Sequence, residues 1–133
     1  FTKSGLHMEQ KSLENLEIYA LATQIGNSVW RMMDHWDAFT KETIGKQVTR
    51  SADSVAANIA EGYGRFFYKD RRMFCYYSRG SAYETEFWIR TARQRNLIAV
   101  EEFQAFDRTM SEFKNKLNKF IAHLNRKIEE GKQ

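Results

Sequence analysis

The sequence has no proline, one cysteine and only seven glycines in 133 residues. Because residues that break helices are so scarce, long helices are favoured. A lone cysteine, Cys75, cannot form an internal disulfide, which excludes a disulfide-stabilised scaffold and favours a reduced, cytoplasmic compartment. No stretch approaches the roughly 20 apolar residues of a membrane span, and residues 1–7 lack the apolar segment of a secretion signal. We therefore expect no membrane partner.

The composition is that of a folded protein, with 42% hydrophobic and 14% aromatic residues. A chain of this length suits one domain, since domains usually contain roughly 100–200 residues. We expect a single domain over residues 12–130. Residues 1–11 are expected to be a flexible N-terminus, partly non-native because Met8 is a candidate natural start.

Four segments carry apolar residues at the three- and four-residue steps of an amphipathic helix. They are residues 12–36, with a stripe from Ile18 to Trp36; residues 44–63, with a stripe from Ile44 to Tyr63; residues 69–95, with Phe74, Tyr77, Ser81, Trp88 and Ala92 on one face; and residues 103–128, from Phe103 to Ile128. Residues 37–41 read as a short connection. Gly62 and Gly64 are expected to end the second helix in the left-handed conformation, and Asn96 to cap the third.

Such helices cannot bury their apolar stripes alone, and short connections make sequential neighbours antiparallel. The predicted fold is all-α, an antiparallel up-down-up-down four-helix bundle.

The aromatic residues are concentrated in one part of the chain, because residues 63–88 hold 10 of the 19. Tyr76, Tyr83 and Phe87 lie about 100° from the third apolar stripe, so both faces of that helix cannot point inward. Large exposed apolar patches usually mark interfaces, which favours self-association. The alternative is a set of aromatic side chains at the rim of a wide core.

The excess positive charge is confined to residues 65–95, which carry +5 of a total of +4, against −2 before them and +1 after. The candidate nucleic-acid-binding residues are Arg65, Lys69, Arg71, Arg72, Arg79, Arg90, Arg93 and Arg95. Arginines interleaved with exposed aromatic rings suit single-stranded or looped RNA. The alternatives are a solvated helix face and pairing with the acidic groups of a protein partner, for which the chain would be an adaptor.

No arrangement of residues indicates catalysis, a cofactor or a metal. His7, His35 and His123 are far apart, and none stands three or four residues from a glutamate on one helix face, as di-iron bundles require. Cys75 has no partner for nucleophilic work and is interpreted as a small core residue. Gly62 and Gly64 lack the rest of a phosphate-binding loop. We therefore expect a non-enzymatic protein.

A polar stripe runs along the second helix beside its apolar one, and the third helix offers small and acidic residues. Buried polar groups must pair, because an unmet donor or acceptor costs roughly 1–3 kcal/mol. We expect an inter-helix network in which Asn58, Ser81 and Arg50 or Arg65 satisfy Glu61 and Glu84. The alternatives are two hydrated stripes or, least favoured, a small-molecule or metal site around Glu61 and Glu84. The network residues are Arg50, Ser54, Asn58, Glu61, Gly62, Gly64, Ser81 and Glu84.

The run Asn-Ile-Ala-Glu-Gly-Tyr-Gly-Arg at 58–65, followed by Gly80-Ser81 and Glu84, resembles one bacterial family. This family comprises four-helix-bundle proteins encoded in intervening sequences of the large-subunit ribosomal RNA gene, the S23 type. The resemblance extends from about Leu13 to Leu124. It implies an antiparallel bundle that assembles into a ring, typically a pentamer, with no established catalytic activity. It also implies kinship with the accessory protein of diversity-generating retroelements, a basic bundle that works with a reverse transcriptase and RNA.

Two positions depart from the family pattern. Ala56 stands where the family usually has proline, so the second helix should be straighter. Phe67 stands where a serine cap is common, and Asp70 is the nearest alternative cap.

The charge, the exposed aromatic residues and the family resemblance together predict a non-enzymatic ring that binds RNA or another nucleic acid through residues 65–95.

Overall fold

The computed structural model describes residues 3–133, with side chains from residue 17 onward. All described elements are helical, which confirms the all-α prediction. They are α1 (Lys3–Met32), the 3₁₀ turn η1 (Met33–His35), the single turn α2 (Ala38–Thr40), the π turn η2 (Lys41–Gly45), α3 (Lys46–Tyr63), α4 (Tyr68–Gln94) and α5 (Val100–Glu129).

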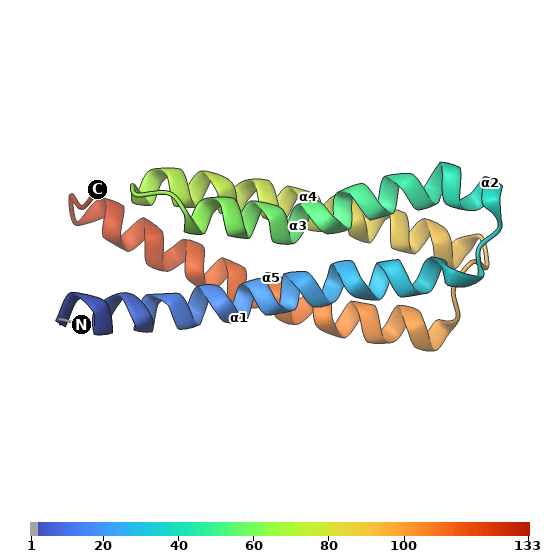
Figure 1. Cartoon of the computed structure of the whole chain (residues 1–133), viewed down its shortest axis with the longest axis horizontal. Coiled ribbons are helices and arrows are strands. Elements are labelled where there is room, and N and C mark those ends of the chain that lie inside the picture. The colour runs from blue at the N-terminus through green and yellow to red at the C-terminus, as the bar shows by residue number, and fades with distance from the viewer. Residues whose placement is uncertain (1–2) are drawn as a thin grey trace.

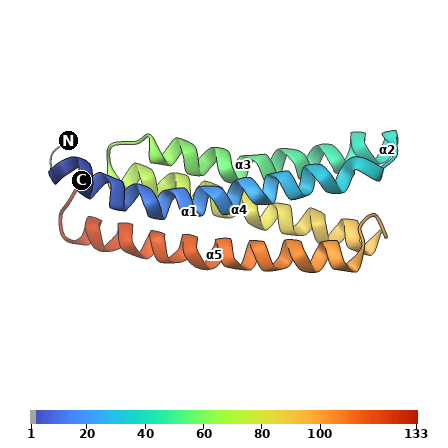
Figure 2. The same ribbon diagram turned by 60° about the horizontal axis from the view of Figure 1, so that its bottom comes forward.

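The four long helices lie side by side, and successive ones run in opposite directions (Figure 1). Each packs against two others, in the cyclic order α1, α3, α4, α5. Helices α3 and α5 are therefore diagonally opposed, as the turned view shows (Figure 2). The loop between α3 and α4 lies at the same end of the bundle as both chain termini, whereas α2 lies at the other end (Figure 1).

The predicted stripes of three helices form the core. Ile25 and Val29 of α1, Val48 of α3, and Phe113 and Leu117 of α5 are almost completely buried. Each helix thus turns one apolar face inward, as the three- and four-residue spacing indicated. Tyr63 is an exception, because the end of α3 leaves half of its surface exposed.

Helix α4 presents a different face to the core from the one predicted. Most of its buried residues are small, and of the predicted stripe only Ala92 is among them: Cys75, Ser78, Ala82, Thr85, Glu86, Ile89 and Ala92. Tyr77, expected inside, is 52% exposed. The reason is space: Ser78 Oγ donates to the Val55 carbonyl at 2.8 Å, so α4 lies too close to α3 for a ring to fit between them. The interpretation of Cys75 as a small core residue is confirmed, since it is 5% exposed.

The connection between α1 and α3 is more regular than the loop predicted over residues 37–41. Asp37 caps α2, because its carboxylate accepts from the Thr40 N–H at 2.8 Å. The π turn η2 then continues directly into α3. Trp36 ties this connection to the one between α4 and α5, since its indole N–H donates to the Leu97 carbonyl at 2.9 Å.

Helix α4 ends as predicted and begins differently. Asn96 has a φ of +60°, and the Leu97 N–H returns to the Ala92 carbonyl at 2.9 Å, which closes the helix in a left-handed cap. At the start of α4, neither Phe67 nor Asp70 provides a side-chain cap. The Tyr68 N–H donates instead to the carbonyl of Gln133.

The two glycines at the end of α3 have a role other than the one predicted. Gly64 has a φ of −78°, which is right-handed, so left-handed capping at this position was a wrong prediction. Gly62 is buried, and a Cβ on it would lie 2.9 Å from the Phe74 Cβ. The lack of a side chain at Gly62 therefore permits the close approach of α3 and α4.

The start of α1 also differs from expectation, because its helical backbone begins at Lys3 rather than near residue 12. The side chains of residues 3–16 lie outside the described part of the chain, and so do residues 1 and 2 altogether. The prediction of a flexible segment over 1–11 therefore remains a prediction.

Replacing Gly62 should test the close helix contact. We expect Gly62→Ala to lower the free energy of unfolding by about 1–3 kcal/mol, because α4 must move to admit the methyl group. Urea denaturation followed by circular dichroism measures this change. Gly64→Ala is the matched control, since a Cβ there meets its nearest neighbour at an ordinary 3.6 Å. Equal stability of the two variants would contradict the interpretation.

Candidate nucleic-acid interface on helix α4

The basic residues of α4 and of the loop before it are almost free of carboxylate partners. Among the described side chains, only Arg65 of the eight candidate cations forms an ion pair, with Glu61 at 3.3 Å. Both groups are about half exposed, so this pair contributes little to stability. The other seven cations form no ion pair with a carboxylate of residues 17–133.

The two glutamates of α4 are neutralised by cations from neighbouring helices. Glu84 pairs with Arg50 of α3 and also accepts from the Trp88 indole N–H at 3.2 Å. Glu86 is buried and pairs with Lys114 of α5 at 2.9 Å. Since these partners come from outside α4, its own arginines keep their charge toward solvent.

One side of α4 combines arginines with tyrosine rings. The Arg72 and Arg79 guanidinium groups lie 6.0 and 5.1 Å from the Tyr76 ring centroid, within the range of cation–π contacts. Each also donates to an asparagine of α5, Arg72 to Asn125 at 2.8 Å and Arg79 to Asn118 at 3.0 Å. These contacts orient the guanidinium groups without neutralising them.

A second group of cations lies at the loop between α3 and α4. Arg71 donates through Nε to the Arg65 carbonyl at 2.7 Å, and Arg65 lies 4.8 Å from the Phe74 ring. Phe66 is 78% exposed and makes an edge contact with Phe67. This corner, with the exposed Lys69 beside it, presents rings and cations together at the end of the bundle that holds both termini (Figure 1).

The remaining three cations lie near the other end of α4. Arg93 donates to the Ile98 carbonyl at 3.2 Å and helps to close the helix. Arg90 and Arg95 are exposed and make no side-chain hydrogen bond or ion pair within residues 17–133. At 1.5 Å per residue, the cations are distributed over roughly 40 Å of helix.

The polar residues between α3 and α4 form two hydrogen-bonded groups and one ion pair. Ser51 and Thr85 hydrogen bond at 3.0 Å in the core, and Ser54 and Ser81 do so at 3.0 Å nearer the surface. Arg50 reaches Glu84 across the two helices.

Of the expected network, Glu61 stays on its own helix, whereas Asn58 is linked to Ser81 of α4 through the Ser54 hydroxyl. Asn58 donates to the Ser54 carbonyl at 2.8 Å and to its hydroxyl at 3.0 Å, and Glu61 pairs with Arg65. Glu61 and Glu84 therefore have separate partners and are not brought into one site.

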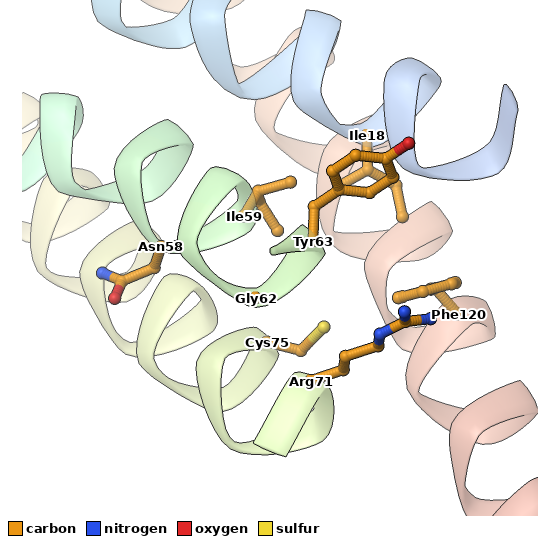
Figure 3. Close-up of a pocket in the computed structure, with 8 residues that line it drawn as sticks. All are labelled: Ile18, Asn58, Ile59, Gly62, Tyr63, Arg71, Cys75 and Phe120. Atoms are coloured by element: carbon orange, nitrogen blue, oxygen red, sulfur yellow. The ribbon is translucent and has the colours of Figure 1, made fainter. Parts of the chain in front are cut away.

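The small cavity beside these pairs does not accommodate a substrate. It has a volume of about 10 Å³, room for roughly one water molecule, and lies among residues of α1, α3, α4 and α5 (Figure 3). Cys75 lines it, and burial raises the pKa of its thiol to about 12, although Arg79 opposes this shift. At neutral pH the thiol is thus protonated and weakly nucleophilic. No group of three possible metal ligands occurs in the described part of the chain.

The outward side of α4 carries an apolar surface that we call the α4 crest. It consists of Met73, Tyr76, Tyr77, Tyr83 and Phe87, each at least 40% exposed, around Gly80. A Cβ on Gly80 would meet nothing within 4 Å. The expected exposure of Tyr76, Tyr83 and Phe87 is therefore present, and the sequence analysis missed Met73 and Tyr77 as their neighbours.

Three residues that support the interface were also missed. Lys114, Asn118 and Asn125 contact α4 from α5, and they recur at steps of four and seven beside the apolar stripe. This spacing marks a polar face of α5 in the sequence. The polar face of one helix does not, however, reveal which side chains of another helix will contact it.

The fold is a four-helix bundle with a basic, aromatic helix on one side. Within the described residues, no helix is long and apolar enough to cross a bilayer. The model of the 23S rRNA-intervening sequence protein family matches residues 14–119. The chain belongs to this family, as the resemblance indicated.

A solved structure has the same fold. It is a protein of unknown function from the S23 ribosomal protein family of Bacteroides thetaiotaomicron, with a TM-score of 0.75 and 20% sequence identity. The similarity covers 82% of this chain and 98% of that one. At this identity the likeness concerns the fold alone. No curated protein matches the sequence.

The buried thiol gives a direct test of whether Cys75 is chemically active. We expect it to be unreactive toward a thiol reagent such as dithionitrobenzoate at pH 8, because its pKa of about 12 leaves almost no thiolate. One equivalent of thiol should react once the chain is unfolded in urea. Rapid labelling of the native protein would show instead that Cys75 is accessible and activated.

Proposed function

We propose that this protein is a non-enzymatic homo-oligomer that binds RNA through the cations of α4 and of the loop before it. The observation that supports the proposal is that seven of the eight cations lack a carboxylate partner in the described structure, while Glu84 and Glu86 are neutralised from outside α4. Free guanidinium groups suit phosphate, which they bind with two hydrogen bonds.

The aromatic rings favour single-stranded RNA over a regular duplex. Phe66 and Phe67 are exposed beside Arg65 and Arg71, where unstacked bases can lie against a ring. The orienting contacts of Arg72 and Arg79 to α5 reduce the side-chain entropy that binding would otherwise cost. An RNA partner also fits the proposed cytoplasmic location.

The α4 crest supports the homo-oligomeric part of the proposal. Gly80 lies in the middle of an exposed helix, where glycine costs roughly 0.5–1 kcal/mol relative to alanine and no contact within the chain requires it. A second copy packing close to Gly80 would account for both the glycine and the exposed rings around it. We propose a closed ring, of five copies as the family resemblance implies.

Assembly would also increase the positive charge that one RNA strand encounters. One copy carries a net charge of only +4, which is modest for a nucleic-acid-binding protein. Several copies of the +5 segment in a ring produce a larger summed field and allow one RNA strand to engage more than one copy.

RNA binding should depend on three arginines. We expect a single-stranded oligonucleotide to bind at low salt, with affinity that falls steeply as salt rises. In the triple variant Arg71→Ala, Arg72→Ala, Arg79→Ala, the slope of log affinity against log salt should decrease by about two, because each phosphate contact with a single strand contributes about 0.7. Fluorescence anisotropy measures both quantities.

The control removes the same amount of charge elsewhere. Arg31→Ala, Arg108→Ala, Lys119→Ala changes three exposed cations outside residues 65–95 and should leave the salt slope nearly unchanged. Absence of RNA binding by the unaltered protein at low salt would refute the RNA part of the proposal. Copurification of an acidic protein, with no RNA, would favour an adaptor instead.

Self-association should depend on the α4 crest. Light scattering of the unaltered protein should give a mass of several times 15.7 kDa. Gly80→Leu should lower that mass toward one copy, because the new side chain prevents close approach, while circular dichroism stays helical. Ala105→Leu, at an exposed position of α5, is the matched control. If light scattering gives the unaltered protein the mass of a single copy at micromolar concentration, the ring is ruled out.

A further inference from the structure

A cleft of about 450 Å³ lies where the end of α1 meets the π turn and the start of α3. Its volume is within the range of roughly 300–1,000 Å³ that is usual for small-molecule sites. Its lining includes Trp30, Met33, Asp34, Lys41, Lys46 and Thr49. None of them belongs to the basic surface of α4.

One wall of the cleft is an exposed indole. Trp30 is 67% exposed, whereas Trp36 is buried with its N–H bonded, and Trp88 is half-buried with its N–H on Glu84. Met33 is a second apolar residue of the lining. A flat, accessible ring of this kind is a stacking surface for a planar aromatic group.

The lining of the cleft also carries positive charge that the fold leaves available. Lys41 has no carboxylate partner within residues 17–133. Lys46 pairs only loosely with Glu42, at 3.7 Å, and both side chains are 74% exposed. Arg50 also lines the cleft, but Glu84 already holds its guanidinium group. Two lysines can therefore contact an anion.

The cleft also contains polar groups without strong partners. The Thr49 hydroxyl donates to the Met33 thioether sulfur at 3.3 Å, which is a weak acceptor, so an oxygen of a ligand could replace it. Asp34 is exposed and is the single acidic residue of the lining. A carboxylate at this position can accept hydrogen bonds from hydroxyl groups.

We infer that this cleft binds a nucleoside phosphate, with the base against Trp30 and the phosphate between Lys41 and Lys46. The sugar hydroxyls lie toward Asp34 in this arrangement. The inference uses one ligand to explain an exposed ring, two available cations and a lone carboxylate in one cleft. It does not rest on the proposed RNA site of α4. The same chemistry is offered by a free mononucleotide and by the phosphorylated end of an RNA strand.

The test is a titration of the full chain with adenosine monophosphate, followed by tryptophan fluorescence. Stacking on Trp30 should quench emission saturably at millimolar ligand. Adenosine and inorganic phosphate should each bind at least about tenfold more weakly, since each keeps only one of the two contacts, and tenfold corresponds to about 1.4 kcal/mol. A 5′-phosphorylated oligonucleotide is the second arm, and whichever ligand quenches at lower concentration identifies the source.

Variants locate the binding to the cleft. Trp30→Ala should abolish the quenching, and Lys41→Ala with Lys46→Ala should weaken it at least about tenfold. Trp88→Phe and Lys119→Ala, which alter a ring and an exposed lysine away from the cleft, should retain it. The inference is overturned if neither phosphate ligand quenches, if adenosine alone binds as tightly as its monophosphate, or if the Trp30 and lysine variants behave like the controls.

Discussion

The close contact between α3 and α4 determines most of what this bundle presents to its surroundings. Gly62 and Ser78 bring the two backbones together, and the Ser51–Thr85 hydrogen bond satisfies the polar atoms that this contact buries. Since only small side chains fit between the helices, the large rings of α4 must lie on its flanks and outward side. The α4 crest is thus a consequence of packing inside a single chain.

The same contact determines where the charge is exposed. With α4 pressed against α3 and α5, Glu84 and Glu86 reach cations of those neighbours, while the arginines stay at the edges and in the loop. The two glutamates of α4 are therefore neutralised in the folded state, whereas the cations of α4 have no carboxylate partner among the described side chains. A helix with a modest excess of charge in sequence becomes a more positive surface once folded.

Much of the fold could be predicted from sequence, because the apolar period of α1, α3 and α5 is regular and Asn96 ends α4. The inward face of α4 could not be predicted in this way. Both of its faces carry apolar residues, and periodicity counts Tyr77 as core although Ser78 and Ala82 occupy that space. The sequence indicated Arg50 or Arg65 as partners of Glu61 and Glu84, and the structure pairs Arg50 with Glu84 and Arg65 with Glu61. The partners on α5 and the cleft at Trp30 depend on how distant segments meet, which spacing along one helix does not report.

The hydrogen bond from Trp36 to Leu97 joins the two connections at one end of the bundle. At the opposite end, the α3–α4 loop is linked through the Tyr68 N–H to the carbonyl of Gln133, which lies beyond the end of α5 rather than in a second connection between helices. Transient separation of the helices should accordingly start at the end that holds the termini and progress toward Trp36. The loop that presents the cations is thus the part of the bundle best able to adjust its shape, while the far end acts as a fixed hinge.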